Sequence, residues 1–183
     1  MPEKDVARAV RRALAILDAS QVLVGIPAEA GEHEGGISNA ALGYILDTGD
    51  LETNLPPRPW LVPGVEAVRD QITKQLATGA RKVIDAAIAS DGDVRAARAE
   101  AAKALERVGL IAQGSIQRRI SEGIAPALSE RTVYARLHRR KNRRSAGKMT
   151  PLIDTGQFIR SITYVVKISN GYVKHDVRSR YVR

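Results

Sequence analysis

The sequence predicts an α+β protein in which helices dominate, and three features of its 183 residues carry that prediction. Apolar residues recur at three- and four-residue spacings over long segments, which is the pattern of an amphipathic helix. Short stretches rich in β-branched residues, over 22–26 and from 162 onward, predict strands. Between them, "LPPRPWLVPG" at 55–64 predicts an extended connector, because each proline disfavours helical backbone at the preceding residue.

The predicted helices are separated by clear start and stop signals. A short helix begins after Ser38, a suitable N-cap, and stops at Gly49. Helical spacing returns at Val65 and continues to "SDGD" at 90–93, which divides the helical region in two. The first helix of the chain carries one apolar stripe, formed by Val6, Val10, Leu14 and Leu17.

The most regular segment follows "SDGD" and predicts one helix of roughly 28 residues, long enough to span about 42 Å. Its alanine-rich stripe allows neighbouring helices to approach closely. A further short helix is expected after Ser129. The long stripe consists of Val94, Ala97, Ala101, Leu105, Val108, Ala112, Ile116 and Ile120.

The predicted strands lie far apart in the sequence. "SQVLVGI" at 20–26 is interpreted as a short buried strand, and Ile162, Tyr164 and Val166 fall on one face of a second strand. "SNG" at 169–171 is a hairpin signal, so "YVKHDV" is expected to form the returning strand.

Composition indicates a single domain with a thin core. Hydrophobic residues make up 44% of the chain but aromatic residues only 4%, and many apolar positions are alanine. We therefore expect one α+β domain over 1–173, completed by partner subunits, and a C-terminal arm over 174–183.

The inventory of reactive side chains does not predict an enzyme. There is no cysteine, and no Gly-rich phosphate loop ending in Lys-Ser or Lys-Thr occurs. Glu32, His33 and Glu34 are adjacent in a Gly-rich loop, where neighbouring residues do not converge on one metal ion. Asp47 and nearby acidic residues are interpreted as turn and capping groups. We expect no catalytic residue, metal site or cofactor, and no stretch approaches the roughly 20 apolar residues of a membrane span.

Charge is distributed unevenly along the chain. Residues 1–100 hold 11 Lys and Arg against 15 Asp and Glu, a net charge of −4. Residues 101–183 hold 18 against 5, a net charge of +13, which gives +9 for the whole chain. Such asymmetry indicates contact with a polyanion or an acidic neighbour.

The positive charge is concentrated in a predicted loop over about 136–150. No acidic residue lies between Glu130 and Asp154. Three interpretations stay open: phosphate contacts with DNA, contact with an acidic protein partner, and a solvated basic surface. The residues of this basic loop are Arg136, Arg139, Arg140, Lys141, Arg143, Arg144 and Lys148.

The connector holds the only tryptophan of the chain. Prolines fix its backbone, and Arg and Trp are residue types favoured at interface hot spots. One interpretation is that it docks to a neighbouring subunit; the other is a rigid loop that pins its own Trp onto the core. The docking residues under the first interpretation are Pro56, Pro57, Arg58, Pro59 and Trp60.

The order of these segments resembles the neck and tail-completion family of tailed bacteriophages, which includes head–tail joining and virion morphogenesis proteins. The resemblance covers roughly residues 20–167 and runs through "VLVGIP", "NAALGYILDTG", "LPPRPWLVPG", "LSERTVYAR" and "PLIDTGQFIRSITYVV". The connector and "PLIDTGQFIRSI" are its most specific pieces. In the second of these, the turn of the family motif is formed by Leu152, Asp154, Thr155 and Gly156. The chain has "LDTGD" where such proteins often carry a Glu-Gly ending.

The resemblance implies a small curled antiparallel sheet packed with long α-helices, in a structural component of the virion. Copies would form a homo-oligomeric ring between the portal or head connector and the tail tube, around the DNA channel. The implied partners are copies of the chain, adjacent neck, portal-adaptor, tail-tube or terminator proteins, and packaged double-stranded DNA. The protein would be made in the bacterial host cytoplasm and act in the virion, without a membrane.

Two alternative functions stay open. Within the same class, the protein is a tail terminator that caps the tube. In a different class, it is a stand-alone basic nucleic-acid-binding protein that uses residues 131–148.

Overall fold

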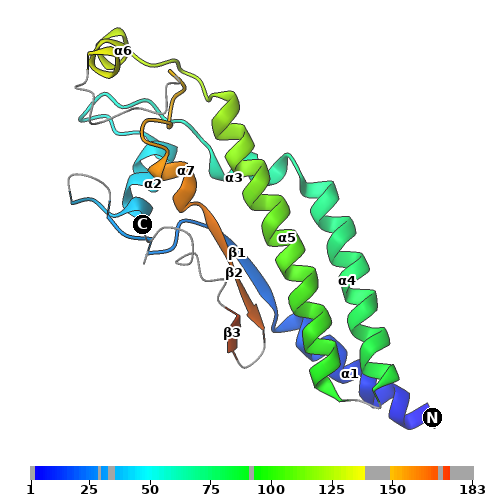
Figure 1. Cartoon of the computed structure of the whole chain (residues 1–183). Helices are drawn as coiled ribbons and strands as arrows, with labels where there is room; N and C mark the ends of the chain where they lie inside the picture. The colour runs from blue at the N-terminus through cyan, green and yellow to red at the C-terminus, as the bar shows by residue number, and fades with distance from the viewer. Residues whose placement is uncertain are drawn as a thin grey trace. The chain divides into compact units, whose positions relative to one another are not determined.

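The computed structural model describes residues 3–28, 30–32, 36–90, 93–138, 149–168 and 171–173, with the backbone alone at 3–4 and 171–173 (Figure 1). Within these residues the protein has an α+β fold with seven helices and one sheet of strand order β1-β2-β3, which confirms the predicted class. The elements are α1 (Glu3–Asp18), β1 (Gln21–Gly25), α2 (Asn39–Thr48), α3 (Leu61–Glu66), α4 (Arg69–Ala89), α5 (Val94–Glu122), α6 (Glu130–Leu137), α7 (Gln157–Ser161), β2 (Thr163–Ile168) and β3 (Gly171–Val173).

The structure has two compact units, each built from separate stretches of the chain, where the sequence predicted one domain over 1–173. We call the first the helical unit and the second the connector unit. The predicted arm, 174–183, lies outside the described residues. The helical unit takes the described residues of Met1–Val24, Val68–Ala112 and Tyr164–Arg183; the connector unit takes those of Gly25–Ala67 and Gln113–Thr163.

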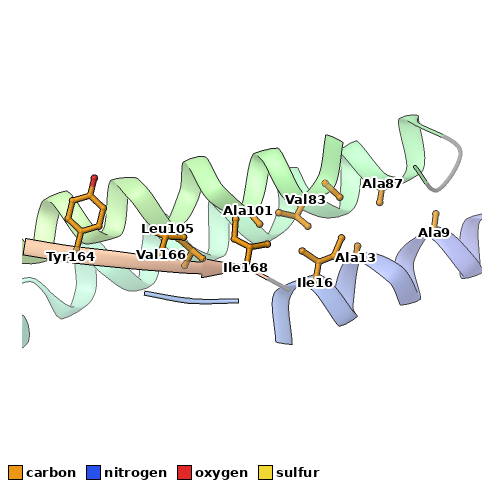
Figure 2. Packing of buried hydrophobic residues seen from close by; sticks show 11 residues of the cluster. Ala9, Ala13, Ile16, Val83, Ala87, Ala101, Leu105, Tyr164, Val166 and Ile168 are labelled. Carbon is orange, nitrogen blue, oxygen red and sulfur yellow. The ribbon is translucent and has the colours of Figure 1, made fainter. Parts of the chain in front are cut away.

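The core of the helical unit is made largely of small side chains (Figure 2). Helix α1 packs against α4, and Gly79 of α4 lies so close to Ala104 of α5 that a Cβ at Gly79 would collide with it. Small residues therefore bring the helix axes together, as the alanine content predicted. The buried residues of this core are Ala9, Ala13, Ile16, Val83, Ala87, Ala97, Ala101, Leu105, Tyr164, Val166 and Ile168.

The predicted apolar stripe of α1 lies beside the buried face: Val6, Val10 and Leu17 are half-buried. Ala9, Ala13 and Ile16 face the core, whereas Leu14 is 51% exposed. Alanine at the centre of this face allows α1 to lie close to α4, and Leu17 packs against the core as a half-buried residue. The stripe of α5 is confirmed, since its members from Ala97 to Ile120 are buried. The division at "SDGD" is also confirmed, because α4 ends at Ala89 and α5 begins at Val94.

The sheet follows the predicted hairpin more closely than the predicted first strand. β2 pairs antiparallel with β3, with Val166 opposite Val173 and Ile168 opposite Gly171. Ile162, Tyr164 and Val166, which the alternation predicted on one face, are all buried, and Ile168 continues that face. β1 is only half-buried: Val22 and Val24 pack against the core, whereas Leu23 points to the opposite face and is 57% exposed.

Two short helices replace segments that the sequence predicted as irregular. α3 begins at Leu61, inside the predicted extended connector, and holds Pro63 in its first turn. Proline is tolerated there because the first N–H groups of a helix have no intrahelical acceptor. α7, with five residues, follows the turn over residues 152–156 and is too short to show a helical period.

Candidate functional site

The end of the proline connector is buried in the connector unit. Trp60 is only 3% exposed, and its indole Nε1 donates a hydrogen bond to the Gly43 carbonyl at 3.0 Å. The ring meets Phe158 edge to face, with centroids 5.3 Å apart and planes at 85°. A Cβ at Gly43 would lie 3.2 Å from the indole, so a glycine makes room for it. Trp60 therefore joins α2 to α7.

Asp47 fixes the start of α3 against α2. Its Oδ1 accepts hydrogen bonds from the backbone N–H of Trp60 at 2.8 Å and of Leu61 at 3.3 Å. These donors lie at the first turn of the helix, where a carboxylate also interacts favourably with the helix dipole. The prediction that Asp47 is a capping group is confirmed.

Arg58 is buried as well and serves as an internal anchor. Its side chain donates from Nε to the Pro126 carbonyl at 3.0 Å and from a terminal nitrogen to the Ala127 carbonyl at 3.2 Å. Burial, together with the positive charge of Arg136, lowers the pKa of Arg58. The residue is 6% exposed, so its donors are used within the chain.

These contacts favour the second interpretation of the connector, a rigid segment that pins its own tryptophan. The docking interpretation needs side chains that a partner can reach, and Arg58 and Trp60 are covered by the chain itself. Of the predicted docking residues, Pro57 and Pro59 are exposed and Pro56 is half-buried. If the connector docks to a partner, its prolines are therefore the residues that make the contact, and this stays a prediction.

Arg136 differs from what the sequence predicted for it. Its side chain is 8% exposed and lies 3.9 Å from Asp154 Oδ1. It donates to the Ile153 carbonyl at 2.7 Å and to the Thr150 carbonyl at 3.2 Å. The predicted contact with DNA or an acidic partner does not suit this arginine, because its side chain is buried and binds acceptors of its own chain. The other members of the predicted basic loop, Arg139, Arg140, Lys141, Arg143, Arg144 and Lys148, lie outside the described residues.

The turn over residues 152–156 is the segment that Arg136 holds. Leu152 has φ +64, a left-handed conformation that a branched side chain rarely adopts, and Arg136 binds the carbonyls on both sides of it. Gly156, with φ +79, precedes α7. Thr155 accepts from the Gln157 N–H through Oγ1 and from Arg160 through its carbonyl. The turn thus sets where Phe158 meets Trp60.

Sequence reasoning missed two partners in this cluster, Gly43 and Phe158. One signal was present: the chain has a single Trp and a single Phe, and each occurs in one of the two most specific pieces of the resemblance. Large aromatic side chains bury more area than other residues, so the only Trp and the only Phe of a chain are candidates for a shared core.

The polar side chains of this unit bind and position its backbone. Arginine donors face backbone carbonyls, and the Asp47 carboxylate faces backbone N–H groups. Among the described residues, no group of three or more His, Cys, Asp or Glu side chains is placed to hold a metal ion. Within the same part of the chain, no helix has the length and apolarity needed to cross a membrane.

Comparison of the chain with protein-family models, with curated proteins and with solved structures finds no match.

Proposed function

We propose that this protein is a structural component of a tailed-phage neck, acting in tail completion or head–tail joining without catalysis. The observation that carries the proposal is the convergence of three segments on which the resemblance rests. Gly43 and Asp47 come from "NAALGYILDTG", Trp60 from "LPPRPWLVPG" and Phe158 from "PLIDTGQFIRSI", and they meet in one cluster.

Convergence supports the proposal because it gives the motif segments a common physical task. Separate chance similarities would have no reason to contact one another, whereas parts of one inherited framework would. The task is mechanical: the cluster locks a proline connector, a helix end and a turn into one shape. A protein that must fit between two rigid rings needs such fixed surfaces.

The surface of the described residues also suits a protein that works among partners. Large apolar side chains remain exposed on several elements, among them Leu51 at 97%, Tyr44 at 71% and Tyr134 at 65%. The division of charge between the two parts of the sequence provides opposite signs for contacts between copies. A closed ring uses two different surfaces of each subunit, which such a division supports.

A nonsense mutation in the phage gene that encodes the chain tests this proposal. Electron microscopy of the lysate is expected to show filled heads and tails that are not joined. If the protein is instead a tail terminator, tails of uncontrolled length will appear, because the cap that ends polymerisation is missing. Normal, infectious particles, or a gene that lies outside a cluster of virion genes, would overturn the proposal.

A further inference from the structure

Strand β1 is an open edge of the sheet. It pairs with β2 on one side, and among the described residues no strand lies beyond it. Edge strands of natural proteins are protected by charged side chains, by proline or by a segment that covers them. The five residues of β1 include neither a charge nor a proline, and Leu23 is 57% exposed. β1 therefore has the features of an edge that accepts a further strand.

The opposite edge of the sheet is protected. β3 comprises three residues, Gly171–Val173, and Lys174 follows it directly in the sequence. A strand of this length beside a lysine is a poor template for pairing. Of the two edges that the described strands form, β1 is thus the open one.

The C-terminal arm, 174–183, has the sequence pattern of a strand. It lies outside the described residues, but its side chains alternate in character along the sequence. A period of two predicts a strand with one charged face and one less polar face. The charged positions are Lys174, Asp176, Arg178 and Arg180, and the positions between them are His175, Val177 and Ser179, with Tyr181 after them.

The arm and the stretch of sequence that contains β1 are opposite in charge. Residues 13–57 hold seven Asp and Glu but no Lys or Arg, and the arginines of α1 lie nine or more residues before β1. Asp18, three residues before β1, is exposed. On the neighbouring strand, Lys167 is half-buried and already interacts with another group of the chain. The arm holds four Lys and Arg against one Asp, so the two segments attract each other.

We infer that the C-terminal arm of one copy adds as a strand to β1 of the next copy. β1 and β3 lie on opposite sides of β2, so the arm leaves its own sheet at the edge away from β1. Main-chain hydrogen bonds supply the affinity, and Arg178 and Arg180 face the acidic surface around Asp18. Because the donor and acceptor surfaces differ, the contact repeats from copy to copy. The inference rests on the proposed function for the ring itself, and it adds the strand that closes each step.

Cysteine scanning tests this contact in the full-length chain, which has no cysteine of its own. A Leu23→Cys chain is mixed under mild oxidation with a chain of different size that carries one cysteine, placed in turn at each position of 176–182. Mixed dimers are counted on a non-reducing gel. A disulfide needs Cα atoms within about 7 Å, and alternate residues of a paired strand face the same side. The yield is therefore expected to rise and fall with a period of two, with the best position several-fold above its neighbours.

Two controls decide between strand pairing in a second copy and its rivals. Leu14→Cys, on an exposed leucine of α1, replaces Leu23→Cys and is expected to give low yields without a period. A chain that carries Leu23→Cys and the best arm cysteine together reports folding of the arm onto its own sheet. An internal disulfide in that chain, without mixed dimers between single-cysteine chains, would overturn the inference. Yields that do not exceed the Leu14→Cys control would also overturn it, and a strand of a different neck protein on β1 would give that result.

Charge reversal in the arm gives the second measurement. Arg178→Glu together with Arg180→Glu is expected to lower the cross-linking rate at the best remaining position about tenfold. The matched control makes the same change in net charge at Arg8 and Arg11, which are exposed on α1. Equal reductions in the two variants would show that the arm is not selected by the charge around β1, and the choice of the arm as the added strand would then fail.

The outcomes for this inference and for the proposed function are separable. Rings seen by electron microscopy without the period of two in cross-linking would remove this contact and leave the proposed function standing. A clear period in a chain whose loss leaves virions normal would do the opposite.

Discussion

At the scale of single residues, the protein concentrates its few large aromatic groups where they fix its shape. The only Trp and the only Phe of the chain pack on each other, and Gly43 and Asp47 accept hydrogen bonds from Trp60. The other buried apolar side chains of the connector unit are isoleucines, so the indole is the largest apolar group that this unit buries. The cluster therefore matters more for the structure than its small number of residues suggests.

Replacing Trp60 with Ala is expected to lower the free energy of unfolding by about 3–5 kcal/mol, since a buried indole is removed and a cavity is left. The Gly43 carbonyl is also left without its donor. Urea unfolding followed by far-UV circular dichroism measures the effect. Tyr134→Ala is the control, because Tyr134 is 65% exposed and its removal is expected to cost less than about 0.5 kcal/mol. Equal effects of the two changes would contradict the internal role of Trp60.

Tyr164 makes the stability of the helical unit sensitive to alkaline pH. Burial, and then the negative charge of Glu106, raise its pKa above the ordinary value of 10.0. Above pH 10 the unfolded chain loses the phenol proton while the folded chain still holds it. Ionisation thus favours unfolding, and the stabilisation present below pH 10 is lost as the pH rises through the folded pKa.

Tyr164→Phe removes this titration. The variant is expected to lose less stability than the wild type between pH 9 and about pH 11, a window set by the unfolded tyrosine pKa. Urea unfolding at several pH values gives the two curves, and only their difference is used because other groups titrate in both proteins. Parallel curves would show that Tyr164 does not carry the effect.

At the scale of elements, helices with a regular apolar spacing could be predicted from the sequence, whereas features set by a few local residues could not. Helix α5 was predictable because its apolar spacing continues unbroken from Ala97 to Ile120. A spacing that continues over so many residues fits only a helix with one buried face. The stripe of α1 was not, because a pattern that favours large side chains overlooks alanine as a packing residue. The five residues of α7 cannot show a period at all.

The candidate site was predictable in its positions but not in its contacts. The sequence singled out Arg58, Trp60 and the turn at 152–156, and all belong to the connector unit. It did not reveal that Arg58 and Arg136 bind backbone carbonyls, because a carbonyl acceptor leaves no mark in the sequence. The sequence does not distinguish an arginine that water solvates from one that the protein itself solvates.

Helix α5 contains two glycines that differ in surroundings, and they yield a matched pair of variants. A Cβ at Gly109 would collide with the ring of Tyr164, whereas nothing lies within 4 Å of a Cβ at Gly114. Gly109→Ala is expected to cost about 1–3 kcal/mol through overpacking. Gly114→Ala is expected to add about 0.5–1 kcal/mol, because alanine is the better helix former at an open position.

Thermal unfolding of the two variants beside the wild type measures these opposite shifts. The substitution is chemically the same and the helix is the same, so differences in propensity cancel. If the melting temperatures of both variants shift in the same direction, the contact of Tyr164 with Gly109 does not limit the packing of α5.

At the scale of the whole molecule, positive charge decides between the proposed function and its rival. A net charge of +9 attracts DNA without sequence preference, and the largest cluster of that charge is in residues 136–148. Arg136 is internal, so the remaining members of the predicted basic loop carry any phosphate contact. A neck protein touches packaged DNA in passing, whereas a dedicated binder must hold it.

We therefore expect weak binding of the purified protein to short duplex DNA, with a dissociation constant of about 10⁻⁴ to 10⁻⁶ M at physiological salt. Replacing Arg139, Arg140, Arg143 and Arg144 with Ser should leave the circular dichroism spectrum unchanged. It should also reduce the slope of log K against log salt by about 0.9 for each phosphate that the variant no longer neutralises.

The control removes four exposed charges from α1 and α4, namely Arg8, Arg11, Arg81 and Lys82. Equal reductions in the two variants would mean that net charge alone drives binding. A wild-type dissociation constant below about 10⁻⁶ M, with a steep dependence on salt, would favour the stand-alone DNA-binding alternative. A neck protein that touches DNA only in passing needs no such affinity.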